Sequence, residues 1–481
     1  MILGYIFCAV LALAPALQAV FDLRLQLAFQ YAVLLGCLAW AFLRAFGEGL
    51  PAGLFSRRQY PLLGVAALSL ASVAASPLRG QIFNEWGNFA AGLLILAFAP
   101  FLAKEERERV NTAAAWAAWL VFAVSFLQVF VFRNFHSITP LTNFNALALF
   151  SVMMIPPALE GRRWALAGAM VVLMVWTQSL GAALALLAAA AFYAGSRFRA
   201  LGRGNAALLA VLGLLGAAVF YGLQADSVAG RLAWWRSAWD MFSARPLAGF
   251  GAASFSWAQG VFQPGGAFRE HSIYAHNYYL EFLAENGLPA ALLWFWAVFA
   301  AARSRAGLVK YSLIAVLAHS LVDFGLSVPA NFWLFCYLLA SPREEAGATV
   351  RPSRPAAAYA LAFAALLVLA AACLHYRALA FENARGRALS AALAGDAAEA
   401  EARLRPALES RLFRGPALDF LGRVSLTAPA AAGRAAVYYE MALLENIYDA
   451  EAWRALRRIY SAPGLEAQAR GLELRRKGAL R

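Results

Sequence analysis

The chain has 481 residues, of which 62% are hydrophobic and only 14% are charged, and its formal net charge is +14. Soluble domains are about half apolar and a quarter charged, so this composition excludes an ordinary soluble enzyme and a disordered, collagen-like or disulfide-scaffold protein. The basic residues share no single patch, which excludes nucleic acid as the expected partner. Cys8, Cys37, Cys336 and Cys373 lie in apolar runs without metal-ligand spacing, so neither a disulfide framework nor a metal site is expected.

Apolar runs long enough to cross a bilayer, about 17 to 25 residues each, recur along the chain. The run at 164–194 is too long for one upright span, and the polar, turn-prone segment 177–181 interrupts it, so we expect two short helices there. The sequence therefore predicts an all-α, polytopic transmembrane bundle of about 13 spans. The runs lie near 2–20, 25–46, 60–76, 82–103, 110–132, 143–159, 164–194, 206–223, 287–302, 308–323, 325–341 and 356–374.

The distribution of positive charge predicts the orientation of these spans. With the N-terminus in the cytoplasm, most arginines and lysines between spans fall in cytoplasmic loops, and the short outer loops hold only Arg24, Arg79 and Arg133. Since no positive segment precedes the first apolar run, we expect an uncleaved first span. The loop 224–286 and the tail 375–481 then lie outside the cytoplasm. We predict two domains: a transmembrane domain over 1–374, with the site in loop 224–286, and a periplasmic helical domain over 375–481.

The tail contains a repeated helical pattern. The spacing of Ala400, Leu404, Ala407 and Leu408 recurs about 35 residues later. Each copy is followed by a second signature, which in the later copy begins at Trp453. This pattern resembles tetratricopeptide repeats, which often present a concave face to a protein partner. A generic alanine-rich helical hairpin is the alternative. The matching second copy consists of Ala435, Tyr439, Ala442 and Leu443.

Loop 224–286 concentrates residues suited to phosphate binding and proton transfer. The planar guanidinium of arginine binds phosphate through two parallel hydrogen bonds, and histidine exchanges protons near neutral pH. The arginines are Arg231, Arg236, Arg245 and Arg269, and the histidines are His271 and His276.

Each of these features also has a structural alternative. Arg231 and Arg236 are equally compatible with binding lipid headgroups at the membrane boundary, and the loop tryptophans with an interfacial belt. A capping or structural role at the start of a helix over 278–285 is the alternative for His276. Gly249-x-Gly251 lacks the preceding strand of a dinucleotide fingerprint and indicates a tight turn.

The order of short motifs resembles the O-antigen ligase and polymerase superfamily of bacterial membrane glycosyltransferases. The ligase signature of His, Asn/Ser/Gln, nine residues, Gly, two residues and Gly/Thr/Tyr matches through His276, Asn277 and Gly287 and departs at Ala290. The break at 177–181 usually reads Ser-Arg-Gly in this superfamily, and Leu180 replaces the arginine here. The resemblance covers roughly 140–340 and also includes Arg231, Trp235-Arg236, Pro246-Leu247-x-Gly249-x-Gly251, Phe255, Leu280, Glu285, Asn143-x-Asn145, 318–324, Pro329 and Asn331.

This resemblance implies a GT-C-like bundle in the bacterial inner membrane that takes a glycan from undecaprenyl pyrophosphate. Arg231 and Arg236 would bind the pyrophosphate, and Asn277, Arg245 and Arg269 would be further substrate-binding residues. His276 would take the proton of the acceptor hydroxyl in an inverting reaction. No Asp-x-Asp pair occurs in the sequence, so we expect a metal-independent reaction without a cofactor.

Ionisable residues within apolar segments are candidates for supporting the site, because their burial in lipid is costly. His319 and Asp323 are four residues apart, and we expect them on one face of a helix. Glu281 is a further supporting candidate, and Glu85 a weaker one. A hydrogen bond between helices is the structural alternative for the His319–Asp323 pair.

The chemistry alone leaves several functions open. Ligation to a lipid core, polymerisation of repeat units and transfer to a protein hydroxyl use the same donor. Lipid, glycan or protein acceptors and a periplasmic protein partner all remain possible. A lipid or glycan transporter and a non-catalytic assembly scaffold are alternatives of another class, which a His276→Ala variant would distinguish from a transferase.

Overall fold

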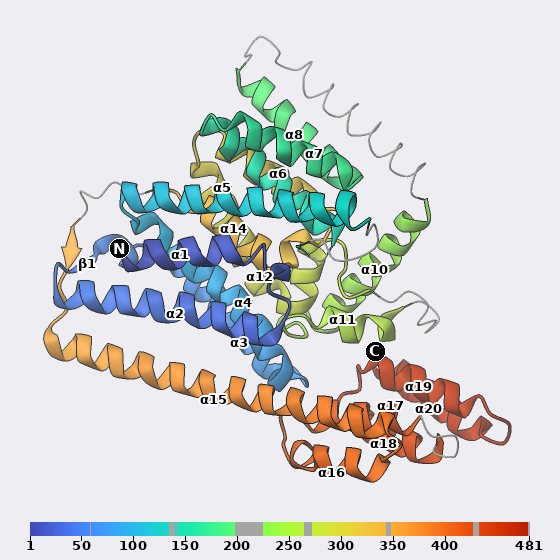
Figure 1. Ribbon diagram of the computed structural model, residues 1–481. Helices are drawn as coiled ribbons and strands as arrows, with labels where there is room; N and C mark the ends of the chain where they lie inside the picture. The colour runs from blue at the N-terminus through green and yellow to red at the C-terminus, as the bar shows by residue number, and fades with distance from the viewer. Residues whose placement is uncertain are drawn as a thin grey trace.

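The computed structural model describes residues 1–57, 59–133, 140–141, 143–197, 225–263, 272–342, 348–426 and 432–479. These residues are almost entirely helical, and two short strands, β1 (Leu50–Pro51) and β2 (Thr349–Val350), pair antiparallel. Figure 1 shows a helical bundle, with the long helix α15 along one side leading to a smaller group of helices at the C-terminal end. The all-α class predicted from composition is confirmed.

The bundle is built from apolar helices. Among the described residues, five helical segments are long and apolar enough to span a membrane: Leu23–Phe46, Arg79–Phe101, Lys104–Val131, Tyr278–Ser304 and Arg354–Leu393. Shorter apolar helices pack between them, and the apolar run at 206–223 lies outside the described residues. The helices are α1 (Ile2–Leu13), α2 (Leu23–Phe46), α3 (Tyr60–Ala75), α4 (Arg79–Phe98), α5 (Lys104–Phe126), α6 (Phe144–Glu160), α7 (Trp164–Trp176), α8 (Leu180–Arg197), α12 (Tyr278–Ser304), α13 (Val309–His319), α14 (Pro329–Leu339) and α15 (Arg354–Leu393).

Short turns of other helix types connect these elements. Most are 3-10 turns, which are common at the ends of α-helices, and one π turn extends α5. They are η1 (Gln18–Val20), η2 (Ala52–Phe55), η3 (Ala99–Phe101), η4 (Leu127–Val131) and η8 (Gly325–Ser327).

The predicted break in the apolar run 164–194 is confirmed. Helix α7 ends at Trp176 and α8 begins at Leu180, with Gln178 between them in the left-handed region at φ 52°. Arg163, before α7, donates to Asn111 O at 3.1 Å, and Ser196, near the end of α8, is hydrogen-bonded to Tyr311 at 2.7 Å. Both contacts lie at the end of the bundle where α5 and α13 begin, so α8 returns toward the end from which α7 came.

Helix α12 joins two segments that the apolar pattern separates. The helix expected at 278–285 and the apolar run from 287 form one element with a kink at Gly287, where φ is 74° and ψ is 171°. This backbone conformation is essentially restricted to glycine. Pro289 follows, where a missing amide hydrogen is tolerated beside the kink.

The expectation that His319 and Asp323 share one helix face is wrong. Helix α13 ends at His319, and the chain then makes tight turns in which Leu321 N–H donates to Ala318 O and Val322 N–H to His319 O. Asp323 therefore lies beyond the helix, and one of its carboxylate oxygens accepts the N–H of Phe324 at 2.8 Å. A carboxylate that binds a local backbone amide favours a turn over continued helix.

Helix α15 connects the bundle to the tail without interruption. It runs for 40 residues, so the boundary expected after residue 374 lies inside it. Its apolar stretch is almost fully exposed on the protein surface, which suits contact with lipid. Tyr31 on α2 is hydrogen-bonded to His375 on α15 at 2.9 Å, which ties the two helices together.

The tail consists of antiparallel helices whose repeated residues form its core. The residues of both predicted copies are buried or half-buried, and Gly422 lies where a Cβ atom would come within 2.8 Å of the Tyr439 ring. Helical pairing is therefore present, and the tetratricopeptide identity of the pairs stays a prediction. The helices are α16 (Ala397–Leu408), α17 (Arg414–Ser425), α18 (Ala432–Glu445), α19 (Ala450–Tyr460) and α20 (Glu466–Ala479).

Candidate functional site

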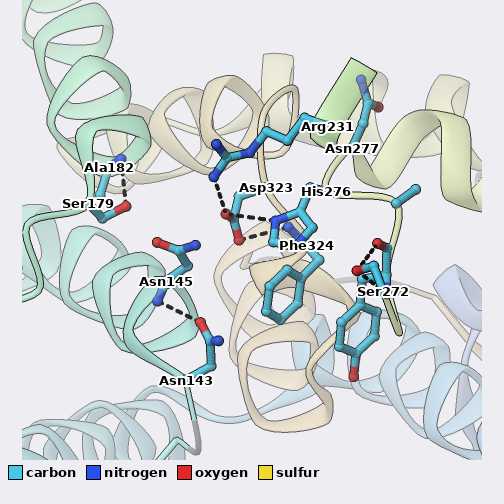
Figure 2. Close-up of polar contacts among 12 residues, drawn as sticks. Asn143, Asn145, Ser179, Ala182, Arg231, Ser272, His276, Asn277, Asp323 and Phe324 are labelled. Carbon is cyan, nitrogen blue, oxygen red and sulfur yellow. Dashed lines mark hydrogen bonds and ion pairs between the residues drawn. The ribbon is translucent and has the colours of Figure 1, made fainter. Parts of the chain in front are cut away.

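Three segments that are distant in sequence meet at one end of the bundle. Helix α10 (Ala225–Ala244) brings Arg231, the segment before α12 brings His276, and the turn after α13 brings Asp323. Arg231 Nη2 lies 3.9 Å from Asp323 Oδ2, and His276 Nδ1 lies 3.5 Å from the same oxygen. Figure 2 shows the carboxylate between the guanidinium and the imidazole. Asp323 is 2% exposed and Arg231 is 8% exposed, so these charges interact away from bulk water.

His276 is held in a backbone conformation that few residues adopt. Its φ is 52°, in the left-handed region, which costs free energy and persists only where the surroundings enforce it. Trp235 Nε1 donates to the His276 carbonyl at 3.2 Å, and the Trp234 ring stacks on the imidazole with centroids 4.9 Å apart. The Phe324 ring packs edge-on against the imidazole at 4.8 Å. The aromatic contacts therefore fix the imidazole plane, while Asp323 faces Nδ1.

Two polar residues support the segment that carries His276. Asn277 caps α12, since its side-chain oxygen accepts from Leu280 N–H at 3.0 Å, and its Nδ2 donates to Leu321 O at 3.0 Å. Glu281 accepts from Ala275 N–H at 2.7 Å and from the Ser327 hydroxyl at 2.6 Å. These bonds join the His276 segment to the turn that carries Asp323. Glu281 thus lies where a supporting residue was predicted, and Asn277 holds the backbone of both segments.

The surroundings keep Asp323 ionised. Burial alone would raise the pKa of Asp323, but the contact with His276, the neighbouring His319 and the Phe324 N–H outweigh burial, so the pKa lies below its ordinary value. Burial lowers the pKa of Arg231, and the Asp323 charge opposes this effect. An ionised carboxylate facing Nδ1 favours the tautomer whose Nε2 accepts a proton and stabilises the imidazolium that then forms.

The glycine motifs act through close backbone packing. Gly251 N–H donates to Glu285 O at 2.8 Å, and Leu288 N–H donates to Pro246 O at 2.8 Å. Gly249 and Gly287 both have positive φ, and a Cβ atom on either would lie 2.3 Å from a backbone oxygen of the opposite segment. These glycines therefore allow the backbone of segment 246–251 to pack directly against the backbone of α12 at its kink. We call this backbone contact the clasp. The prediction of a tight turn at Gly249 is consistent with this geometry.

A second group of polar residues faces the charged cluster from α6 and the α7–α8 break. Asn143 caps α6 by accepting from Asn145 N–H at 2.7 Å, and Figure 2 shows Asn145 and Ser179 across from Asp323 and His276. His319 is fully buried beside Gly181, where a Cβ atom would lie 3.7 Å from its ring. Neither ring nitrogen of His319 has a hydrogen-bond partner among the described atoms. A supporting role for His319 stays a prediction.

Other predicted residues lie elsewhere. Arg236 is on the surface with 69% of its side chain exposed, and its Nε is 3.9 Å from Asp240. Residues five apart on a helix lie about 140° apart around its axis, so Arg231 and Arg236 point to different sides. Arg245 lies over the rings of Phe250 and Tyr448, at 4.8 and 5.2 Å. Arg269 and His271 are outside the described residues. Glu85 accepts from Asn84 and Asn88 within α4.

Sequence reasoning missed how the aromatic residues act. The sequence predicts an interfacial belt for the loop tryptophans and includes Trp235 in the family motif, but it does not predict that Trp234 stacks on His276 or that Trp235 binds its carbonyl. Tyr274, which stacks on Phe324 at 4.3 Å, is not among the residues that the sequence singles out. The one available signal was the density of aromatic residues within a few positions of Arg231 and His276.

Comparison with known proteins is consistent with this site. A family model described as O-antigen ligase matches residues 165–295, a segment that contains Arg231 and His276. No curated protein matches the chain. The match supports a role in glycan transfer for polysaccharide assembly, and it does not extend to the tail. The matched segment and the apolar helices therefore support the similarity to membrane proteins of the O-antigen ligase superfamily that the motifs indicate.

Proposed function

We propose that the protein transfers a glycan from undecaprenyl pyrophosphate to an acceptor hydroxyl at the His276 site, on the periplasmic side of the bacterial inner membrane. The observation that carries this proposal is the convergence of Arg231, His276 and Asp323 at one end of the bundle. A buried guanidinium suits a phosphate leaving group, and an imidazole backed by a carboxylate suits removal of a hydroxyl proton.

The proposed step is a direct displacement. The acceptor oxygen attacks the anomeric carbon, and the bond from that carbon to the phosphate oxygen breaks, with its electron pair leaving on the pyrophosphate. The acceptor proton moves to His276 Nε2, while Asp323 stabilises the imidazolium through Nδ1. Arg231 stabilises negative charge that develops on the leaving group. Attack opposite the leaving group inverts the anomeric configuration, and neither a metal nor another cofactor is assigned a role.

One sequence departure and one structural observation shape the proposal. Leu180 stands where the superfamily usually has an arginine, so Arg231 carries more of the phosphate interaction. Arg236 is paired with Asp240 on the surface and contributes less, although it remains a candidate for contact with a long pyrophosphate carrier. Asn145 and Ser179 lie across from Asp323 and His276 in Figure 2, which supports them as candidates for contact with the sugar or the acceptor.

The test is glycan transfer in a host that lacks its own ligase and polymerase. His276→Ala is expected to lower transfer by about 10²- to 10⁴-fold, because it removes a general base. Arg231→Ala is expected to lower it by about 10²- to 10³-fold, as for loss of a charge-stabilising donor. Arg303→Ala, an exposed arginine in the last turn of α12, is the matched control and should retain transfer.

Several outcomes decide between the alternatives. Transfer that survives both site substitutions at matched expression would refute the site assignment and favour a transporter or a scaffold. A product on lipid A core indicates a ligase, long chains on the carrier indicate a polymerase, and glycan on protein indicates a protein O-oligosaccharyltransferase. If Arg236→Ala lowers glycan transfer as much as Arg231→Ala does, both arginines bind the pyrophosphate.

A further inference from the structure

A large cavity lies at the opposite end of the bundle from His276. Its volume is about 1160 Å³, and it is lined by the start of α5, the α6–α7 connection, the α12–α13 connection and the end of α14. Helix α12 has 27 residues and leads from the His276 site to this cavity, a length of up to about 40 Å at about 1.5 Å per residue. The cavity therefore lies at the far end of α12 from the proposed glycan-transfer site.

The cavity concentrates positive charge beside an apolar wall. Its charged lining consists of four basic residues, Lys104, Arg107, Arg163 and Arg305, and two acidic residues, Glu108 and Glu160. Its walls are largely aliphatic, from residues such as Met154 and Leu338. A ligand that matches this lining has an anionic group and an apolar part.

Among the described residues, no ion pair joins an acidic residue of the lining to a basic one. Glu160 Oε2 accepts from Leu308 N–H at 3.1 Å and Val309 N–H at 3.3 Å, so this carboxylate caps the start of α13. Among the described residues, no carboxylate lies within ion-pair distance of the four basic side chains. The positive charges of the cavity thus have no direct counter-charge in the described part of the chain.

Neutral acceptors hold three arginines in place. Arg163 donates to Asn111 O and to Thr112 Oγ1, both at 3.1 Å. Arg107 donates to Leu102 O at 2.8 Å. Arg305 donates to Ala340 O at 3.1 Å. These bonds orient the guanidinium groups and leave their charge intact, since each arginine carries five donors. Burial lowers the pKa of Arg305, the charge of Glu160 opposes this effect, and the charge of Arg107 adds to it.

We propose that this cavity binds a phosphate group, carried by a membrane lipid whose chains lie along the apolar wall. Fixed arginines match phosphate oxygens in geometry and charge. Cytoplasmic loops of membrane proteins are enriched in basic residues, and this enrichment by itself requires only exposed positions. Arg163 and Arg305 instead line a preformed cavity. The cavity is a second binding site, independent of the glycan-transfer site.

The test measures lipid binding to the purified full-length protein by native mass spectrometry. The probes are phosphatidylglycerol, diacylglycerol with the same chains, and inorganic phosphate. The double variant Arg163→Gln/Arg305→Gln is compared with Arg162→Gln/Arg303→Gln, which changes exposed arginines two or fewer residues away. The cavity variant is expected to bind phosphatidylglycerol roughly tenfold or more weakly, as for loss of charge-assisted hydrogen bonds, and the control variant to bind it like wild type.

Each outcome bears on the proposal. Unchanged affinity in the cavity variant, equal loss in the control, or equally tight binding of diacylglycerol would overturn it. Binding that needs phosphatidylglycerol identifies a lipid headgroup as the source of the phosphate, and competition by inorganic phosphate identifies the phosphate group itself as sufficient. If the double variant does not fold, Arg163→Gln against Arg162→Gln makes the same comparison.

Discussion

Asp323 is the residue on which the charged cluster depends. It contacts both Arg231 and His276, and it is almost completely buried. Breaking a buried ion pair is costly, so removal of the Asp323 charge would take the carboxylate away from both Arg231 and His276. The residue also orients His276 through Nδ1, so stability and chemistry are linked at this position.

Asp323→Asn is expected to lower the free energy of unfolding by about 3 kcal/mol at pH 7, as for breaking a buried ion pair. Because the folded-state pKa of Asp323 lies below its ordinary value, this stabilisation is present above about pH 4 and is lost as the pH falls through the folded-state pKa. Thermal unfolding in detergent, at pH 7 and below pH 4, measures the difference in stability between wild type and variant. This difference should be smaller in acid.

The matched control for this comparison is Asp240→Asn. Asp240 is a partly exposed carboxylate whose ion pair is with Arg236, so its loss is expected to change stability by less than about 0.5 kcal/mol. A difference for Asp323→Asn that stays constant from pH 7 into acid would contradict the assigned role of its charge.

At the scale of elements, the kink of α12 and the clasp at 246–251 position the loop over the bundle. Phe250 N–H donates to Ala284 O at 3.1 Å, and Phe255 N–H donates to Glu285 Oε1 at 3.1 Å. Ser72 on α3 donates to Glu285 O at 2.7 Å. The clasp therefore connects the loop, the first part of α12 and α3, and it fixes the start of the helix that follows His276.

Gly287→Ala is expected to destabilise the protein by about 2 kcal/mol or more, because alanine disfavours this backbone conformation and its Cβ would meet Leu247 O at 2.3 Å. The control is Gly168→Ala in α7, where the added Cβ has no neighbour within 4 Å. That change is expected to be neutral or to stabilise by up to about 1 kcal/mol. Unfolding temperatures in the same detergent test this, and equal behaviour of the two variants would argue against the clasp.

At the scale of the whole molecule, the tail packs against the loop that carries part of the site. Tyr448 contacts the rings of Phe250 and Phe262, with centroids 4.9 and 5.7 Å apart, and the Arg245 guanidinium lies over its ring. Arg476 donates to Val261 O at 3.3 Å. In Figure 1 the helices of the tail lie next to α11 (Phe255–Ala258). The tail thus forms part of the surroundings of the loop.

Tyr448→Ala is expected to weaken this docking by roughly 2 kcal/mol, since it removes two ring pairs and a cation–π contact. The undocked population would rise roughly 30-fold, and limited proteolysis of the purified protein should cleave the variant faster. Leu444→Ala, in an 82% exposed position on α18, is the control and should be cleaved like wild type. Equal cleavage of all three proteins would indicate that Tyr448 does not hold the tail.

Local sequence determined that the protein is a bundle of apolar helices and that the chain breaks before Leu180. It also identified His276 as a candidate catalytic residue. Apolar run length, turn-prone residues and residue chemistry are local properties that can be read along the chain. The sequence also singles out Asn277 as a substrate-binding candidate and Glu281 as a supporting one, whereas their backbone hydrogen bonds are visible only in the structure.

Only the tertiary structure decided which charges meet. Arg231, His276 and Asp323 come from three segments, and no spacing in the sequence specifies their distances. Helix periodicity turns Arg236 away from Arg231, and the end of α13 at His319 places Asp323 in a turn where an unbroken helix was expected. The close approach that requires Gly249 and Gly287 is likewise a contact between distant backbones. Packing between segments determines these contacts, and the pattern of residues along the chain does not specify how the segments pack.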